Sequence, residues 1–95
     1  MTINVPTAFT PDGDGLNDDF MPVLSGTDGT GYVFMIFDRW GLSVFESHTP
    51  GEAWNGAFNN AGEVLPQDVY AWSLTVGDGF TADRKVLRGH VTLLK

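Results

Sequence analysis

An acidic, glycine-rich segment near the start of the chain has the residue types of a cation site. It places four carboxylates within eight residues, at positions 12, 14, 18 and 19. Calcium binds six to eight oxygen atoms, and loops of the EF-hand type supply them from alternate positions. With Thr10 as the first position, the third, fifth, seventh and ninth positions are Asp12, Asp14, Leu16 and Asp18. This spacing predicts a calcium site, in which Leu16 contributes its backbone carbonyl.

A second interpretation of the segment stays open. Gly15 stands at the sixth position, where a calcium loop needs a sharp turn, but Met21 replaces the bidentate glutamate of the twelfth position. The calcium interpretation is therefore that of a shortened loop. In the alternative, Asp and Gly are present because they suit the backbone of a tight turn. The ligand spacing favours calcium.

The elements that position this segment are short strands. Residues 69–76 alternate between apolar and small or polar side chains, which predicts a strand that buries Tyr70, Trp72, Leu74 and Val76 on one face. Residues 87–94 predict a terminal strand with Val91 and Leu93 on one face and His90 on the other. The β-branched and aromatic run at residues 32–37 predicts a central strand that is buried on both faces.

Further short strands are expected at residues 3–5, 20–24 and 41–46, and Gly77-Asp78-Gly79 suits a hairpin turn. No segment has a helical period. A chain of 95 residues forms one small domain, which we assign to residues 1–95. The sequence therefore predicts an all-β domain, an immunoglobulin-like antiparallel β-sandwich of about seven strands.

Charge and composition exclude several classes of partner. The net charge is −7, whereas nucleic-acid binding depends on a basic surface that neutralises phosphates. The longest apolar run is far shorter than the ~20 residues of a membrane-spanning helix, so we expect no direct membrane insertion. Met1 is followed by no basic and apolar leader, and we interpret it as an added start. The chain has no cysteine, which excludes disulfides and thiolate chemistry.

Catalytic residues are not expected. His48 follows Ser47 in a turn-like stretch, and His90 lies on the predicted outer face of a strand. Neither histidine has the surrounding signature of a nucleophile and its base. The sequence therefore predicts a domain that is not an enzyme and has no catalytic site.

Two residues are candidates for contact with a partner protein. Arg39 can clamp a carboxylate such as Asp38 or Asp68, or it can present its charge to a partner. Trp54 stands beside Asn55-Gly56 in a loop, so we expect it to be the most exposed tryptophan, whereas Trp40 is expected to be packed.

The chain resembles the gliding motility-associated C-terminal domain, also called the type B sorting domain of type IX secretion. The matching blocks follow in order from near residue 6 to the final residue: PTAFTPDGDGLND at 6–18, IFDRWG at 36–41, VFES at 44–47, WNG at 54–56, DVYAW at 68–72 and GHVTLLK at 89–95. One departure is Asn55, where the family often has aspartate, and this weakens a metal-binding role there.

The resemblance implies a β-sandwich fold and a role as a sorting signal. An N-terminal cargo domain of the same chain would cross the outer membrane through the type IX secretion machinery, via the periplasm, and be secreted or held at the cell surface. An alternative function is a calcium-stabilised carbohydrate-binding or adhesive module, which would need exposed aromatic rings.

Overall fold

The structure is a computed structural model that describes residues 2–11, 18–77 and 84–94. Within these ranges it contains seven strands and one short 3-10 helix. In chain order they are β1 (Thr2–Asn4), β2 (Ala8–Phe9), β3 (Val23–Ser25), β4 (Val33–Phe37), β5 (Ser43–Ser47), η1 (Phe58–Asn60), β6 (Asp68–Gly77) and β7 (Arg84–Leu93).

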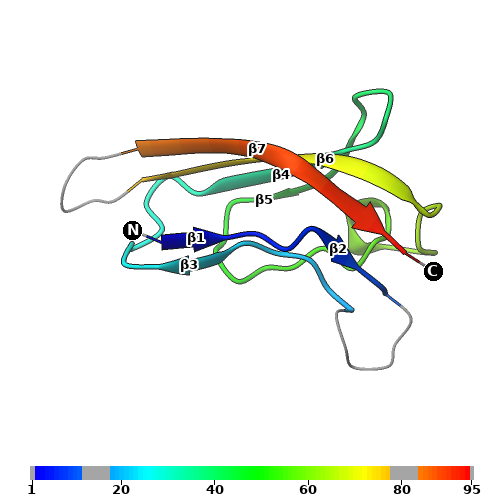
Figure 1. Cartoon of the computed structure of the whole chain (residues 1–95), viewed down its shortest axis with the longest axis horizontal. Helices are drawn as coiled ribbons and strands as arrows, with labels where there is room; N and C mark the ends of the chain where they lie inside the picture. Colours follow the sequence, from blue (N-terminus) through cyan, green and yellow to red (C-terminus); the bar gives the residue numbers. More distant parts are fainter. Residues whose placement is uncertain (1, 12–17, 78–83, 95) are drawn as a thin grey trace.

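The strands form two sheets that face each other (Figure 1). The larger sheet has the order β2-β7-β6-β4-β5, and the smaller sheet consists of β1 and β3. All described pairs are antiparallel except that of β2 with β7, which is parallel. The all-β prediction with two sheets and about seven strands is confirmed.

The long hairpin of β6 and β7 is the centre of the larger sheet. Its register runs without interruption from Asp68 opposite Leu93 to Gly77 opposite Arg84. Tyr70, Trp72, Leu74 and Val76 of β6 are buried on one face, as the alternation predicted. The inner face of β7 contributes the fully buried Val91 and Leu93.

One strand differs from its prediction. In β4, Phe34 and Ile36 are fully buried, but Val33, Met35 and Phe37 are only half-buried. The prediction of burial on both faces is therefore wrong for this strand, because no described element covers the outer face of the larger sheet. β2 and η1 have no counterpart among the predicted elements, while the predicted hairpin turn at Gly77-Asp78-Gly79 extends beyond the described residues.

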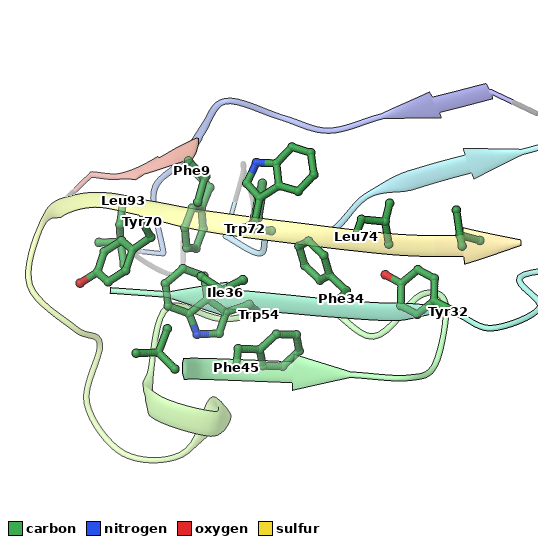
Figure 2. Close-up of a cluster of buried hydrophobic side chains, with 14 residues drawn as sticks. Phe9, Tyr32, Phe34, Ile36, Phe45, Trp54, Tyr70, Trp72, Leu74 and Leu93 are labelled. Atoms are coloured by element: carbon green, nitrogen blue, oxygen red, sulfur yellow. The ribbon is translucent and has the colours of Figure 1, made fainter. Parts of the chain in front are cut away.

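A continuous row of aromatic rings fills the space between the sheets (Figure 2). Phe9 stacks on Phe20 with ring centroids 5.8 Å apart, and Trp54 lies 5.3 Å from Phe9 and 5.3 Å from Tyr70. The hydroxyl of Tyr70 donates to the carbonyl oxygen of Pro66, four residues upstream, at 2.7 Å. Immunoglobulin domains have a similar tyrosine corner at the start of a central strand.

The third tryptophan needs a glycine opposite it. Trp72 pairs in register with Gly89, and a Cβ atom at Gly89 would lie 2.7 Å from the Trp72 ring. Real Cβ atoms do not approach other atoms so closely. Gly89 therefore has a packing role in β7, since it leaves room for the indole.

Candidate functional site

The turn between β4 and β5 is held by its own hydrogen bonds. The N–H of Asp38 donates to the carbonyl oxygen of Leu42 at 2.9 Å, and the N–H of Gly41 donates to that of Asp38 at 3.0 Å. The Asp38 carboxylate accepts from the N–H groups of Trp40 and Leu42, each at 2.9 Å. Gly41 has a φ of 84°, which a glycine adopts without strain. The three residues at the tip, 39–41, are exposed.

Arg39 joins this turn to the start of β6. Its Nε donates to Asp68 Oδ2 at 2.8 Å, and its Nη2 forms an ion pair with the same oxygen. The backbone N–H of Val69 and the Arg39 guanidinium together hold the pKa of Asp68 below its ordinary value. Arg39 therefore clamps one of the two predicted carboxylates, while its side chain stays more than half exposed.

Trp40 is the most exposed large hydrophobic residue of the described chain. Its relative exposure is 81%, and the Arg39 guanidinium lies over its ring, 5.3 Å from the centroid. Leu42 and Phe58 are also exposed, at 57% and 45%, and all three border a surface hollow of about 450 Å³. We call Arg39, Trp40, Leu42, Phe58 and Asp68 the Trp40 surface.

Trp54 lies in the core, so the prediction that it marks an exposed contact surface is wrong. Its relative exposure is 0%, and its indole N–H donates to the carbonyl oxygen of Ala57 at 2.7 Å. The backbone groups of Trp54 and Phe20 exchange two hydrogen bonds of 2.9 Å, which form an isolated bridge between distant segments. This bridge draws the ring between the sheets, next to Tyr70 (Figure 2).

Asn55 has a structural role beside this tryptophan. Its carboxamide oxygen accepts from the N–H of Ala57, and its own N–H donates to Asn60 Oδ1, each at 2.9 Å. The Asn60 amide also donates to the carbonyl oxygen of Ala53 at 2.8 Å. The two asparagines therefore hold the loop closed next to the Trp54 ring.

The acidic segment is described only at its two ends. Thr10 and Asp18 are both half-buried, and the flanking Phe9 and Phe20 stack on each other, so the ends of the segment are held close together. The other predicted ligands, Asp12, Asp14 and Leu16, lie outside the described residues. Within the described ranges, no cluster of three or more histidine or carboxylate side chains could hold a metal ion.

The two histidines, His48 and His90, are both exposed. His48 forms a contact of 2.7 Å with the Glu46 carboxylate, and His90 lies on the outer face of β7 as predicted. The described residues also include no helix long and apolar enough to cross a membrane.

The expectation that Trp40 is packed is wrong, although its position in a turn between two strands was a sequence signal for its exposure. A side chain at the tip of a tight turn between neighbouring strands has no strand beside it, so it points away from the sheet. Phe58 carried no comparable signal, because η1 is a single turn with no periodicity.

A comparison with known protein families gives one result for nearly the whole chain. The family model described as CHU_C Type IX secretion signal domain matches residues 3–93. No curated protein and no solved structure matches the sequence.

Proposed function

Since the chain belongs to the type IX secretion signal domain family, we propose that it carries a cargo, joined to its N-terminal side, through the type IX machinery of the outer membrane. A domain of this family is a sorting signal and not a catalyst, and it marks its protein for export. The match over residues 3–93 is the observation that carries this proposal.

The machinery would dock on the Trp40 surface. Protein interfaces concentrate their binding energy in tryptophan, tyrosine and arginine residues that become desolvated on binding. Trp40 and Arg39 are such a pair, and the turn that holds them is already ordered by the Asp38 carboxylate. A partner would therefore meet a surface that loses little conformational freedom on binding.

Export of a reporter tests both parts of the proposal. A fluorescent protein with a periplasmic leader is joined to residues 2–95 and expressed in a host with a working type IX apparatus and in its translocon mutant. We expect the reporter outside the cell only when the translocon is intact. Retention of the folded reporter in both hosts would contradict the sorting role of these residues.

Variants of the same reporter test the docking surface separately. Trp40→Ala should reduce export by about tenfold or more, because truncation of a hot-spot tryptophan costs about 2 kcal/mol or more. Val23→Ala is the matched control, since Val23 is an exposed apolar residue of the smaller sheet. If sorting works but Trp40→Ala and Val23→Ala export equally, the machinery reads another surface.

We further propose that the acidic segment binds calcium through Thr10, Asp12, Asp14, Leu16 and Asp18. The stacked Phe9 and Phe20 support this proposal, because they bring the two ends of the segment together. Carboxylate and carbonyl oxygens are suitable ligands for this hard cation. Calcium that binds only the folded loop would add about 2.7 kcal/mol to stability at a hundredfold excess over Kd.

Thermal melts with calcium and with chelator test this site. We expect calcium to raise the Tm of the domain and Asp14→Ala to abolish the response. Asp19→Ala is the matched control, since it removes an equal charge from the same segment outside the proposed ligand set. A Tm that does not depend on calcium, or an equal loss in both variants, would leave the segment as a turn.

The exposed ring of Trp40 also suits a second function, the binding of a sugar. Sugar-binding modules stack pyranose rings on exposed aromatic faces, and Trp40 borders a hollow that also contains polar side chains. A glycan array with the isolated domain distinguishes the two functions. The sorting function predicts no reproducible glycan ligand.

A further inference from the structure

One edge of the larger sheet is open along most of β7. β2 pairs with β7 only at Thr92 and Leu93, and no other described strand lies on that side of β7 (Figure 1). The residues from Arg84 to His90 therefore form the outermost strand of the sheet, and most of them are exposed. We call this stretch, residues 84–90, the β7 edge.

The register shows which backbone groups point out of this edge. The N–H groups of successive residues in a strand point to opposite sides, so those of every second residue point to the same side. The N–H groups of Thr92 and Leu94 donate to the carbonyl oxygens of Thr7 and Phe9, on the side of β7 where β2 lies. Because the pairing of β7 with β6 has no register shift, Val86, Arg88 and His90 direct their N–H groups to that same side. The β7 edge thus presents a row of backbone donors and acceptors for another strand.

The charge of the β7 edge is opposite to that of the rest of the chain. The sequence has twelve acidic residues and five Lys and Arg residues, and three of these five are Arg84, Lys85 and Arg88. Arg88 and His90 lie on the outer face, because the alternate residues Val91 and Leu93 are buried on the inner face. A basic strand edge on an acidic domain selects for an acidic partner.

We propose that the β7 edge binds an extended acidic segment of another protein by strand addition. Main-chain hydrogen bonds to residues 86, 88 and 90 would provide affinity, and ion pairs with Arg84 and Arg88, which share the outer face of β7, would provide specificity. The same basic residues disfavour a second copy of this chain, because edge pairing of two copies would bring like charges together. This site lies on the far side of β6 from β4 and β5, whose connecting turn carries Arg39 and Trp40.

Fluorescence anisotropy with a synthetic probe tests the proposal. The probe is a labelled peptide of about ten alternating Glu and Val residues, which spans the edge at about 3.3 Å per residue. We expect it to bind the domain, and an N-methylated peptide with the same side chains to bind at least about tenfold more weakly, since it has no N–H donors. A Lys-Val peptide should not bind, and added salt should weaken the Glu-Val complex.

Two variants locate the binding to the edge. Arg88→Gln should weaken the Glu-Val peptide severalfold, whereas Ser25→Asp, which changes the net charge equally but lies on β3, should not. Val86→Pro removes an outward-pointing N–H without removing a hydrogen bond to β6, and it should weaken binding at an unchanged Tm.

Several results would overturn the proposal. These are no binding of the Glu-Val peptide, equal binding of its N-methylated form, or equal effects of Arg88→Gln and Ser25→Asp. A dimer in sedimentation velocity that is lost in Val86→Pro would identify a second copy as the occupant, which also contradicts it.

Discussion

Trp40 and Trp54 stand in similar sequence contexts and end in opposite environments. Each is followed by a glycine within two residues, and each lies in a connection outside the named strands. Trp40 is 81% exposed, whereas Trp54 is 0% exposed. The difference shows that contacts with distant parts of the chain, and not the neighbouring residues, decide whether a loop aromatic is buried.

The two connections differ in what faces them. The Trp40 turn joins neighbouring strands and forms its backbone hydrogen bonds within itself. The Trp54 segment pairs instead with Phe20, more than thirty residues away. Together, these two segments cover the core on the side opposite the larger sheet. A segment that is paired across the sandwich places its side chains in the core, while a self-contained turn leaves them outside.

Alanine substitution of the two tryptophans should separate stability from recognition. Trp54→Ala removes a large core ring and should lower the free energy of unfolding by about 3–5 kcal/mol. Trp40→Ala should change it by no more than about 0.5 kcal/mol, as exposed substitutions commonly do. Urea denaturation of both variants measures these values.

This contrast fails if the two variants lose similar stability. Trp54→Phe refines the result, because it keeps an aromatic ring but cannot donate to the Ala57 carbonyl. It should be more stable than Trp54→Ala and less stable than the unaltered domain.

Patterns within a strand predicted much of the fold, whereas contacts between distant loops were not predictable. The alternation in β6 and β7 correctly identified the buried faces, because a strand's side chains alternate whatever lies beyond it. Nothing around Trp54 indicates its bridge to Phe20, and nothing in residues 32–37 shows that one face of β4 would stay uncovered. The ion pair of Arg39 with Asp68 was one of two pairings that the sequence offered, and the sequence alone could not choose between Asp68 and Asp38, because that choice depends on where β6 begins beside the turn.

Asn60 should be the polar residue on which the burial of Trp54 depends most. Its side chain bonds to the backbone of Asn55 and Ala53, and its φ of 57° lies in the left-handed region. Asn59 has a φ of 50° but forms no such side-chain hydrogen bond among the described residues. Asn60→Ala should therefore lose about 1–2 kcal/mol more than Asn59→Ala, because only Asn60 has these hydrogen bonds to lose.

Thermal or urea unfolding of the two asparagine variants provides the measurement, and tryptophan fluorescence reports the environment of Trp54. We expect a red-shifted emission in the native baseline of Asn60→Ala alone. Equal loss in both variants would show that the backbone conformation, and not the hydrogen bonds, holds the loop.

Asp38 has the corresponding role in the Trp40 turn, with a smaller expected effect. Asp38→Ala removes the acceptor of two backbone N–H groups at an exposed site and should cost about 1 kcal/mol. Asp38→Asn keeps a side-chain oxygen acceptor and should retain most of this stability. NMR hydrogen exchange at Trp40 and Leu42 checks the local effect, which should be absent at Trp54. Loss of protection at both tryptophans would mean that the two regions are not independent.

The smallest effect should come from Asp68, where the turn meets β6. The Val69 N–H and the Arg39 guanidinium stabilise its ionised form, so its pKa is lower in the folded than in the unfolded domain. A lowered folded pKa contributes stability above the unfolded value of 3.8, and this stability is lost as pH falls through the folded pKa.

The difference in unfolding free energy between the unaltered domain and Asp68→Asn should therefore be constant at neutral pH and decrease only below about pH 4. Urea titrations across this range measure it, and high salt should reduce it because the Arg39 side chain of the pair is more than half exposed. A difference that instead changes near pH 6 to 7 would assign the titration to another group and remove Asp68 from the account of how the Trp40 surface is held.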